Sequence, residues 1–501
     1  MGVDLTNIPI DRNYDMPSGA TGLAPGNASA ILSQFDRKRR LAQTAVPTDD
    51  GKVRASLRER GQPVTLFGEG PADRRDRLRE MLLEEAEGLD GATTDVQMQE
   101  ADDQADQEEE FYTEGLPELL QIRRDIAKYS LPRARDRTAR QREDSTIPLR
   151  THIKHRKTIK EKLHGFELFG TQIAGERPVS ITRFAPNGEI IAAGNWGGGI
   201  KLLDVPNLNE KATLRGHSGI VGGLAWYPGS TLPSSTVSSD SLNIASGAGG
   251  QGGSSEIHFW NLNKDTPIST LQGHTDRVCR VEFHPSGKYL ASASFDTTWR
   301  LWDVETTTEL LLQEGHSRQV FTVSFNTDGS LLASGGFDSI GRIWDLRSGR
   351  TVMILDGHIK EIYSLDWGID GHRVLSGSGD GFAKCWDIRQ VRAVASIGAH
   401  HGNVSDLRWF KGTDANVSSL VESDGVRQEH SPRKAGTFFV SSGFDKNVNI
   451  YSADDWALAK QLSGHSGNVL SVDVTNDAKW IASSGHDRTV KLWGREDGQG
   501  I

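Results

Sequence analysis

A Gly-His pair, replaced once by Ala-His, recurs at a fixed interval through the second half of this 501-residue chain. Successive members of the series His274, His316, His358 and His400 lie 42 residues apart. A period of about 40–45 residues is typical of propellers whose blades each contain four strands. The period therefore predicts an all-β propeller, and it constrains the fold more than any other feature of the sequence.

Three further residues keep a fixed distance from each histidine. A serine follows it after 18 residues, an aspartate after 22 and an aromatic residue after 28. The regular sets are His274/Ser292/Asp296/Trp302, His316/Ser334/Asp338/Trp344, His358/Ser376/Asp380/Trp386 and His465/Ser483/Asp487/Trp493. A fifth set, His400/Ser441/Asp445/Tyr451, fits once a 23-residue insertion is removed.

Serine, histidine and aspartate are also the residues of a hydrolase triad. Five copies of one constellation cannot be five active sites, and nothing distinguishes one copy as catalytic. A hydrogen-bond chain that ties the loops of a blade to its strands explains the repetition, because buried polar groups need mutual partners. We therefore predict structural tetrads and no enzyme, with no catalytic residue, no cofactor and no metal site.

The residues between the repeated positions read as short strands. Residues 277–304 contain an apolar run, a Pro-Ser-Gly turn, a small-residue strand, a tight Asp turn and an alternating strand. Two atypical units follow the same pattern: residues 178–204, and the unit after His217, which keeps Ser246 and Trp260. Together with the five regular units they predict seven blades.

The last blade lacks a fourth strand of its own. The eight residues after Trp493 are too polar to form one. Residues 165–172 supply this strand from the front of the domain, which closes the ring and leaves no open edge. We place the propeller at residues 163–495 and a short tail at 496–501.

The N-terminal part of the chain has a different character. Residues 1–45 are polar and rich in turn formers, which predicts disorder. Residues 46–88 predict a helical hairpin that Gly61 interrupts. On physical grounds alone this hairpin is either a marginal mini-domain or a docking element whose core a partner completes. The candidate partner-docking residues are Leu57, Arg58, Leu66 and Phe67.

Two motifs carry a resemblance to known proteins. Trp-Asp pairs at 302–303, 344–345 and 386–387 look like those of WD40 repeats. The run "VRASLRERGQPVTLFGEGPADRRDRLREML" is similar to the splicing factor motif of pre-mRNA processing proteins. This motif followed by seven blades resembles the WD40-repeat subunits of the U4/U6 small nuclear ribonucleoprotein, and "YSLPRARDR" in the connector agrees.

The resemblance implies a nuclear, non-enzymatic scaffold. Such a protein would bind splicing proteins through its N-terminal motif and propeller, within the U4/U6 particle and the U4/U6·U5 tri-snRNP. The alternative is a generic WD40 substrate receptor or signalling scaffold with a peptide-binding propeller face. That alternative leaves the N-terminal motif unexplained, because the WD40 fold alone says little about function.

Residues 89–162 read as a linker that is first acidic and then basic. The acidic run "DDQADQEEE" lies at 102–110, and the stretch 118–162 carries an excess of Lys and Arg. These charges belong either to a solvated linker or arm, or to a surface that contacts an RNA backbone without reading bases. The candidate RNA-backbone residues are Arg133, Arg135, Arg137, Arg140 and Arg142.

One face of the propeller is expected to bind proteins. The residue before each tight-loop aspartate, and the residues at strand entry, point out at the face that carries these loops. Exposed aromatic residues and arginine there are typical of interaction hot spots. The candidates are Trp196, Arg277, Phe295, Phe321, Phe337, Tyr363, Phe444 and His486.

Composition excludes several other classes. The net charge of −10 argues against generalised nucleic-acid affinity, and two cysteines cannot form a disulfide framework. The N-terminus lacks the pattern of a signal peptide, and no run of eighteen apolar residues predicts a membrane span. We therefore expect an intracellular protein with no membrane partner and no small-molecule substrate.

Overall fold

The computed structural model describes residues 46, 50–64, 70, 74–75, 77–79, 81–82, 118–233, 235–250, 255–412 and 432–495. The chain divides into two compact units, one up to residue 109 and the other from 110 onward. The segment predicted to be disordered (1–45), the acidic run (102–110) and the tail (496–501) lie outside the described residues.

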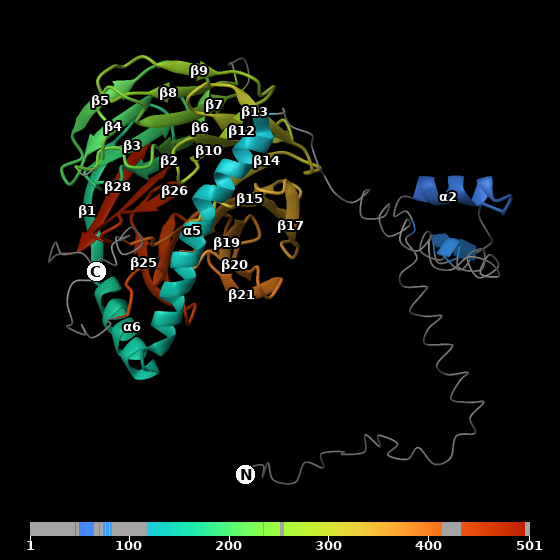
Figure 1. Cartoon of the computed structure of the whole chain (residues 1–501). Coiled ribbons are helices and arrows are strands. Elements are labelled where there is room, and N and C mark those ends of the chain that lie inside the picture. Colours follow the sequence, from blue (N-terminus) through green and yellow to red (C-terminus); the bar gives the residue numbers. More distant parts are fainter. Residues whose placement is uncertain are drawn as a thin grey trace, which may run out of the picture. The chain divides into compact units, whose positions relative to one another are not determined.

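The second unit contains seven antiparallel sheets of four strands each, so the predicted seven-bladed propeller is confirmed (Figure 1). Blade 1 comprises β2 (Val179–Phe184), β3 (Ile190–Asn195), β4 (Ile200–Asp204) and β5 (Glu210–Leu214). Blade 2 comprises β6 (Ile220–Trp226), β7 (Ile244–Gly249), β8 (Ile257–Trp260) and β9 (Ser269–Leu271). Blade 3 comprises β10 (Val278–Phe283), β11 (Tyr289–Ser294), β12 (Trp299–Asp303) and β13 (Glu309–Gln313).

Blades 4 to 7 continue the same order of strands. Blade 4 comprises β14 (Val320–Phe325), β15 (Leu331–Gly336), β16 (Gly341–Asp345) and β17 (Arg350–Leu355), and blade 5 comprises β18 (Ile362–Trp367), β19 (Arg373–Ser378), β20 (Phe382–Asp387) and β21 (Arg392–Gly398). Blade 6 comprises β22 (Val404–Trp409), β23 (Phe438–Gly443), β24 (Asn447–Ser452) and β25 (Leu458–Ser463). Blade 7 comprises β26 (Val469–Val474), β27 (Trp480–Gly485), β28 (Thr489–Arg495) and β1 (Phe166–Ile173).

Blade 7 closes the ring with a strand from the front of the domain, as the sequence predicts. β1 pairs antiparallel with β28, from Phe166 opposite Arg495 to Ile173 opposite Thr489. The outermost strand of this blade therefore precedes blade 1 in the chain, while its three inner strands follow blade 6. The two ends of the propeller are thus held together by backbone hydrogen bonds.

Small residues on the second strand of each blade let neighbouring blades pack closely. A Cβ atom on Gly335 would lie 2.9 Å from Ile362 Cγ2, and one on Gly377 would lie 2.8 Å from Leu407 Cδ1. In both cases the contacted side chain belongs to the first strand of the next blade. Residues with larger side chains would push the blades apart, which explains the Ala, Ser and Gly content of these strands.

The first strand of every blade carries a register shift near its start. In blades 4 and 5 the residues within the shift are Phe321 and Tyr363. A β-bulge leaves one residue outside the ladder and redirects its side chain. The repeated bulge can therefore redirect one side chain in each blade, near the start of the innermost strand.

The basic stretch before the propeller forms two helices that pack on it, α5 (Glu118–Thr146) and α6 (Leu149–Leu163) (Figure 1). The sequence predicts a linker or arm here, whereas the structure makes these residues part of the propeller unit. Leu119 and Ile126 of α5 are buried in a core cluster with Leu310 and Leu311. Two residues of α6 are buried in the core of blades 6 and 7 in the same way.

The first unit holds the expected helical hairpin. Its first helix, α2, spans Asp50–Glu59, and helical residues follow between 74 and 82. Val53, Leu57 and Leu78 form a small buried cluster between them. Gly61 ends the first helix with a φ of 68°, a conformation that glycine adopts without strain. Arg77 donates to the carbonyl of Pro63 at 3.0 Å, which links the second helical segment to the residues just after the first helix.

Candidate interaction surfaces

The structure brings each regular tetrad together in one hydrogen-bond chain. In blade 4, His316 Nδ1 lies 2.8 Å from Asp338 Oδ2, and its Nε2 lies 2.7 Å from Ser334 Oγ. The indole N–H of Trp344 donates to the same Ser334 hydroxyl at 2.8 Å. Each chain of this kind links a tight loop to two strands.

The tetrads of blades 3, 5 and 7 repeat this arrangement. In each, the serine hydroxyl lies 2.7 Å from Nε2 of its histidine and accepts the indole N–H of its tryptophan at 2.8 Å. The serines and tryptophans are at most 3% exposed, so they belong to the blade cores and cannot form part of a binding surface. The residues concerned are Ser292 with Trp302, Ser376 with Trp386, and Ser483 with Trp493.

Electrostatics agree with a structural role for the tetrads. Burial alone would raise the pKa of Asp338, but the hydrogen bond and charge of His316 outweigh it, so this pKa lies below its ordinary value. The hydroxyl of Ser334 is fully engaged, and its residue is 0% exposed. A nucleophile must reach its substrate, so a serine in this position cannot act as one.

Three blades depart from the tetrad pattern. Blade 1 lacks the tetrad, because it carries Ala193, Gly197 and Leu203 at the Ser, Asp and Trp positions. In blade 6, His400 contacts Asp445 and Ser441, but the hydroxyl of Tyr451 donates to the carbonyl of Ala399 at 2.9 Å instead of to the serine. Blade 2 has His217 bonded to its serine but no loop aspartate among the described residues. Instead of contacting a loop aspartate, the ring of His217 stacks on the ring of His258, with centroids 4.1 Å apart.

Five of the eight candidate protein-binding residues form one cluster on blades 3 to 5. The rings of Phe321 and Phe337 are stacked with centroids 6.0 Å apart, and Tyr363 meets Phe321 edge-on at 5.2 Å. Phe295 lies 5.4 Å from Phe337, and the guanidinium of Arg277 lies over its ring at 5.7 Å. All five residues are half-buried. We call this set the aromatic cluster.

The other three candidates are separate from the aromatic cluster. Trp196 of blade 1 and His486 of blade 7 make an edge-to-face contact with centroids 4.9 Å apart. Phe444 is 37% exposed and has no ring partner among the described residues. The expected face therefore carries one aromatic cluster, one aromatic pair across the ring closure and one single phenylalanine.

The five arginines predicted to contact RNA do not form one exposed stripe. Arg137 points at the propeller, with its guanidinium 2.7 Å from Asp328 and donating to the carbonyl of Asp370 at 2.9 Å. Arg140 is also half-buried. Arg133 lies over the ring of Tyr129 at 4.1 Å on an exposed part of α5. Of the five, Arg133, Arg135 and Arg142 are exposed.

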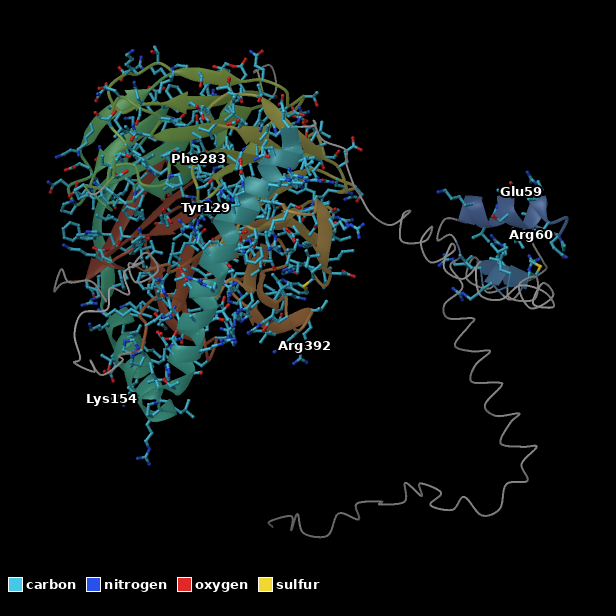
Figure 2. All side chains as sticks on the ribbon, in the orientation of Figure 1. Glu59, Arg60, Tyr129, Lys154, Phe283 and Arg392 are labelled. Atoms are coloured by element: carbon cyan, nitrogen blue, oxygen red, sulfur yellow. The ribbon has the colours of Figure 1, made fainter. Side chains whose placement is uncertain are left out.

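The solvent-facing side of the two helices carries further positive charge. Arg150, Lys154, Lys157 and Lys162 of α6 are exposed. Figure 2 shows the side chain of Lys154 extending away from the body of the unit at the end of the helical pair. We call these four residues, together with Arg133, Arg135 and Arg142, the basic helical surface.

The predicted docking residues of the N-terminal hairpin include both a buried and an exposed residue. Leu57 is 0% exposed within the hairpin core, so it stabilises the hairpin and does not present itself to a partner. Arg58 follows it on the exposed side of α2. Leu66 and Phe67 lie outside the described residues. The hairpin therefore has a small core of its own, and Arg58 is the described docking candidate.

Sequence reasoning missed a buried charge network on the first strands of the blades. Asp406 accepts hydrogen bonds from Arg183 at 2.9 Å and from Arg280 at 3.1 Å. The hydroxyls of Ser364 and Ser471 donate to the same carboxylate at 3.0 and 2.8 Å. These four donors belong to blades 1, 3, 5 and 7, so one carboxylate of blade 6 joins five of the seven blades.

The pKa values in this network follow from burial and charge. Burial would raise the pKa of Asp406, but Arg183, Arg280 and Arg408 together hold it well below its usual range. Burial, followed by the nearby Arg408, lowers the pKa of Arg183 to about 10. The sequence signal was Asp406 and Arg280 at an inner-strand position where the other blades carry Thr, Ser, Gly or Ile.

Other kinds of site are not found in the part of the chain that the structure describes. No helix there is long and apolar enough to cross a membrane. No group of three His, Cys, Asp or Glu residues there could hold a metal ion. Both cysteines are buried as free thiols, and burial raises the pKa of each to about 12.

Two family models match the chain. One, described as "pre-mRNA processing factor 4 (PRP4) like", matches residues 53–81, which lie in the N-terminal hairpin. The other, described as "WD domain, G-beta repeat", matches four stretches of the propeller: residues 265–303, 307–345, 349–387 and 456–494. The matches therefore cover both units of the structure.

Individual proteins from several organisms are also similar to the chain. The chain is 37% identical to the U4/U6 small nuclear ribonucleoprotein PRP4 of Saccharomyces cerevisiae, over 98% of this chain and 99% of the relative. An uncharacterised WD repeat-containing protein of Schizosaccharomyces pombe is 41% identical over 53% of this chain and 56% of its own length. The human U4/U6 small nuclear ribonucleoprotein Prp4 is 39% identical over 40% of this chain. The chain spans about half the length of the Schizosaccharomyces pombe relative and 39% of the human one.

Proposed function

The chain belongs to the family of U4/U6 small nuclear ribonucleoprotein Prp4 proteins, and we propose on this premise that it is a non-enzymatic scaffold in pre-mRNA splicing. It acts in the nucleus, within the U4/U6 particle and the U4/U6·U5 tri-snRNP. The observation that carries this proposal is the combination of the hairpin motif with the propeller, shared with the Saccharomyces cerevisiae relative over almost the whole of both chains.

The hairpin is proposed to bind a splicing protein. It is matched by the specific family model, and its described part buries only a small apolar core, which leaves the exposed residues of α2 for contact with a partner. Arg58, exposed beside the buried Leu57, contributes a charged contact there. A generic WD40 receptor would need no such hairpin.

The aromatic cluster is proposed as a second protein-binding surface. Half-buried rings and a cation over one of them combine large contact area with little conformational entropy to lose on binding. The ring contacts among Phe295, Phe321, Phe337 and Tyr363 hold these side chains in place before a partner arrives. This preorganisation lowers the entropic cost of binding an extended peptide.

The basic helical surface is proposed to contact the backbone of the particle's RNA. Its exposed Arg and Lys side chains are positioned by helices that are themselves fixed on the propeller. Contacts of this kind position a protein on RNA without reading its sequence. The overall charge of −10 confines any attraction for RNA to this local surface.

Recovery of the tagged full chain from nuclear extract tests the scaffold proposal. We expect U4 and U6 small nuclear RNAs and splicing proteins to co-purify with it. Deletion of residues 46–82 should release the protein bound by the hairpin, and Arg58→Glu should weaken its recovery about tenfold, the effect of removing one charge-assisted hydrogen bond. Lys264→Glu, an exposed charge reversal on the propeller, is the control.

The outcomes separate the whole proposal from its parts. Absence of small nuclear RNA from the full-chain sample would refute the scaffold function. Full recovery of RNAs and proteins by residues 118–495 alone would refute the role of the hairpin and leave the scaffold function intact.

A further inference from the structure

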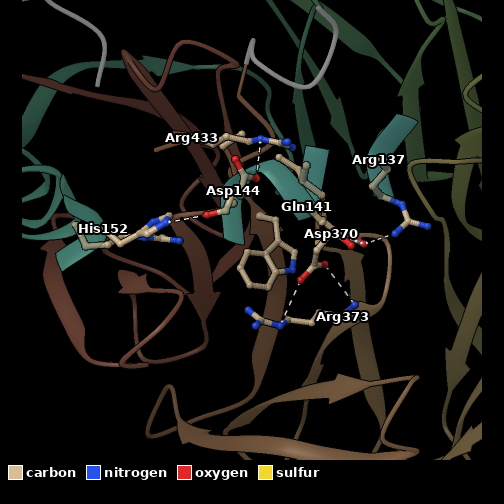
Figure 3. A pocket seen from close by; sticks show the side chains of 13 residues that line it. Arg137, Gln141, Asp144, His152, Asp370, Arg373 and Arg433 are labelled. Atoms are coloured by element: carbon tan, nitrogen blue, oxygen red, sulfur yellow. Dashed lines mark hydrogen bonds and ion pairs between the residues drawn. The ribbon is translucent and has the colours of Figure 1, made fainter. Parts of the chain in front are cut away.

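A small pocket lies where the two helices meet the propeller. It has a volume of about 220 Å³ and is lined by residues of α5, α6, blade 5 and blade 6. Figure 3 shows Arg137, Arg373 and Arg433 around it, with the carboxylates of Asp144 and Asp370 between them. The fourth guanidinium of the lining belongs to Arg156.

The pocket is on the opposite face of the propeller from the aromatic cluster. Its blade 5 residues form the turn between the first and second strands, at Gly368–Arg373. The tight loops of the tetrads connect the second and third strands. In an antiparallel blade these two turns lie at opposite ends of the strands. A ligand in this pocket therefore leaves the aromatic cluster accessible.

The arginines of the pocket are held in place by aspartates. Arg433 Nε lies 2.9 Å from Asp144 Oδ2, and Arg373 Nε lies 3.3 Å from Asp370 Oδ2. Arg156 Nε is fixed by Asp454 at 2.9 Å, outside the pocket. Guanidiniums anchored through one edge keep their other N–H groups for a ligand without a further loss of side-chain entropy.

Two buried donors at the pocket lack partners among the described residues. One is Nη1 of Arg156, and the other is Nε1 of Trp409, whose residue is 3% exposed. A buried donor without an acceptor costs free energy, so each such group needs an explanation. An acceptor on a ligand in the pocket would satisfy both.

The repeat provides an internal control for the tryptophan. Trp226 and Trp367 occupy the equivalent position in blades 2 and 5 and donate to carbonyls of the preceding blade, each at 3.0 Å. The equivalent acceptor for Trp409 is the carbonyl of Asp366, yet its indole N–H does not bond to any described residue. Blade 6 thus departs from the repeat at the pocket.

The charge of the lining indicates the kind of ligand. Four guanidiniums and two carboxylates line the pocket, while Asp328 and Asp454, the partners of Arg137 and Arg156, lie outside the lining. Burial lowers the pKa of Arg156, and among the nearby charges Arg373 lowers it further while Asp454 raises it. A bound anion would relieve the repulsion between Arg156 and Arg373. A phosphoryl monoester carries close to two negative charges at neutral pH and several acceptor oxygens.

We propose that this pocket binds a phosphoryl monoester, with Arg156, Arg373 and the indole N–H of Trp409 as its donors. The group is carried either by a phosphorylated side chain of a partner protein or by a small phosphorylated molecule. The monoester is favoured over a backbone phosphodiester because its three unesterified oxygens can accept from all three donors, whereas a diester has only two such oxygens.

Indole N–H resonances of the full chain, labelled with ¹⁵N-tryptophan, test the pocket directly. The chain has 12 tryptophans, and Trp409→Phe and Trp367→Phe assign the two signals that matter. Titration with inorganic phosphate at constant ionic strength should shift the Trp409 signal saturably. The Trp367 signal should not move, because its N–H is bonded to the carbonyl of Ser324.

A pair of arginine variants tests the role of the guanidiniums. Arg373→Gln should weaken phosphate binding about tenfold or more, the effect expected for one charge-assisted hydrogen bond. Arg347→Gln is the matched control, since Arg347 is similarly exposed and also pairs with an aspartate of its own turn. It should leave phosphate binding unchanged. Equal effects of the two variants would overturn the proposal.

Other ligands separate the sources of the phosphoryl group. Tighter binding of N-acetyl-phosphoserine amide than of inorganic phosphate would identify a partner side chain, and the reverse order a small phosphorylated molecule. Dimethyl phosphate and an RNA duplex without terminal phosphates should not shift the Trp409 signal at matched charge. A shift with these diesters that equals the shift with phosphate would overturn the monoester assignment. So would the absence of a Trp409 shift with every ligand.

Discussion

Among single residues, Asp406 has the widest influence on this fold. Its carboxylate is 1% exposed and accepts from side chains of four other blades. Hydrogen bonds between neighbouring blades are found elsewhere too, such as the one from the backbone N–H of Trp409 to Asp366 at 2.7 Å. Asp406 differs because it reaches blades that are not its neighbours, so it holds the inner ends of the blades in one arrangement.

Asp406→Asn should therefore cost much more stability than an ordinary surface substitution. The variant keeps the shape of the side chain but removes the carboxylate that pairs with the buried Arg183 and Arg280. Breaking a buried ion pair typically costs about 3–5 kcal/mol of the free energy of unfolding. Urea unfolding measures the loss. Asp345→Asn removes the partner of the exposed Arg347 and serves as a control, with an expected loss below about 1 kcal/mol. Equal losses would contradict the role of the network.

The stability difference between the natural chain and Asp406→Asn has a defined pH dependence. The folded-state pKa of Asp406 is depressed, so its stabilising contribution is fully present above the unfolded pKa of about 3.9 and is lost as pH falls toward the folded value. The difference in unfolding free energy between the natural chain and Asp406→Asn should stay constant from pH 7 to about 5 and shrink below about pH 4. A difference that grew on acidification would contradict this sign.

Elements differ in how far the sequence alone predicts them. The strands and the tetrads follow from a local register, because His316, Ser334 and Asp338 lie within 22 residues. The closing strand was predicted from the blade count instead, because the residues after Trp493 are too polar to complete the last blade. The Asp406 network does not, since Arg183 and Asp406 are 223 residues apart. Neither do the packed helices: Arg137 and Asp328 are 191 residues apart, and no window of sequence contains both. Pairs of residues this far apart in the chain can be recognised only after the blades have been counted and arranged in a closed ring.

The α5–α6 pair was the element most easily mistaken for a linker. In a strongly basic stretch, only Leu119, Ile126, Ile159 and Leu163 are buried hydrophobic residues. This is too sparse for an amphipathic pattern to stand out. Ion pairs such as that of Lys160 with Asp455 at 3.0 Å add to this packing at the surface. The two helices therefore attach through few apolar residues, and residues of the propeller cover these.

A fragment that begins at residue 163 should be less stable than one that begins at 118. It lacks the side chains of Leu119, Ile126 and Ile159 and exposes the propeller residues beneath them. At roughly 1.5 kcal/mol or more for each buried apolar side chain, the free energy of unfolding should fall by several kcal/mol. Thermal unfolding of the two fragments compares them directly. Equal midpoints would show that the helices only lie on the propeller and do not stabilise it.

At the scale of the whole molecule, the two faces of the propeller unit have different properties. The tight loops of one face carry the aromatic cluster, while the turns of the other face hold the helices. The inner strands connect these faces rigidly, since the charge network fixes their arrangement. A scaffold of this build can hold a protein on one face and an RNA backbone beside the other at a fixed separation.

Charge reversal on the basic helical surface tests the RNA side of this division. Arg137 must be kept, because its ion pair with Asp328 holds α5 on the propeller. The exposed residues Arg135, Arg142 and Lys154 are instead changed together to Glu, with no buried side chain disturbed. Affinity of the full chain for base-paired U4/U6 RNA should fall. Its dependence on salt should also flatten, by about 0.7–0.9 in the logarithmic slope for each phosphate that the variant no longer neutralises.

The control for this variant changes three exposed lysines of the propeller to Glu, namely Lys264, Lys288 and Lys360. It alters the net charge by the same amount but leaves the helices intact. If attraction to RNA came from overall charge, both variants would lose affinity equally, and the proposed surface would be wrong. If only the helical variant loses affinity and salt dependence, the RNA contact lies on α5 and α6. Unchanged values for both variants would mean that other proteins alone connect this chain to the RNA.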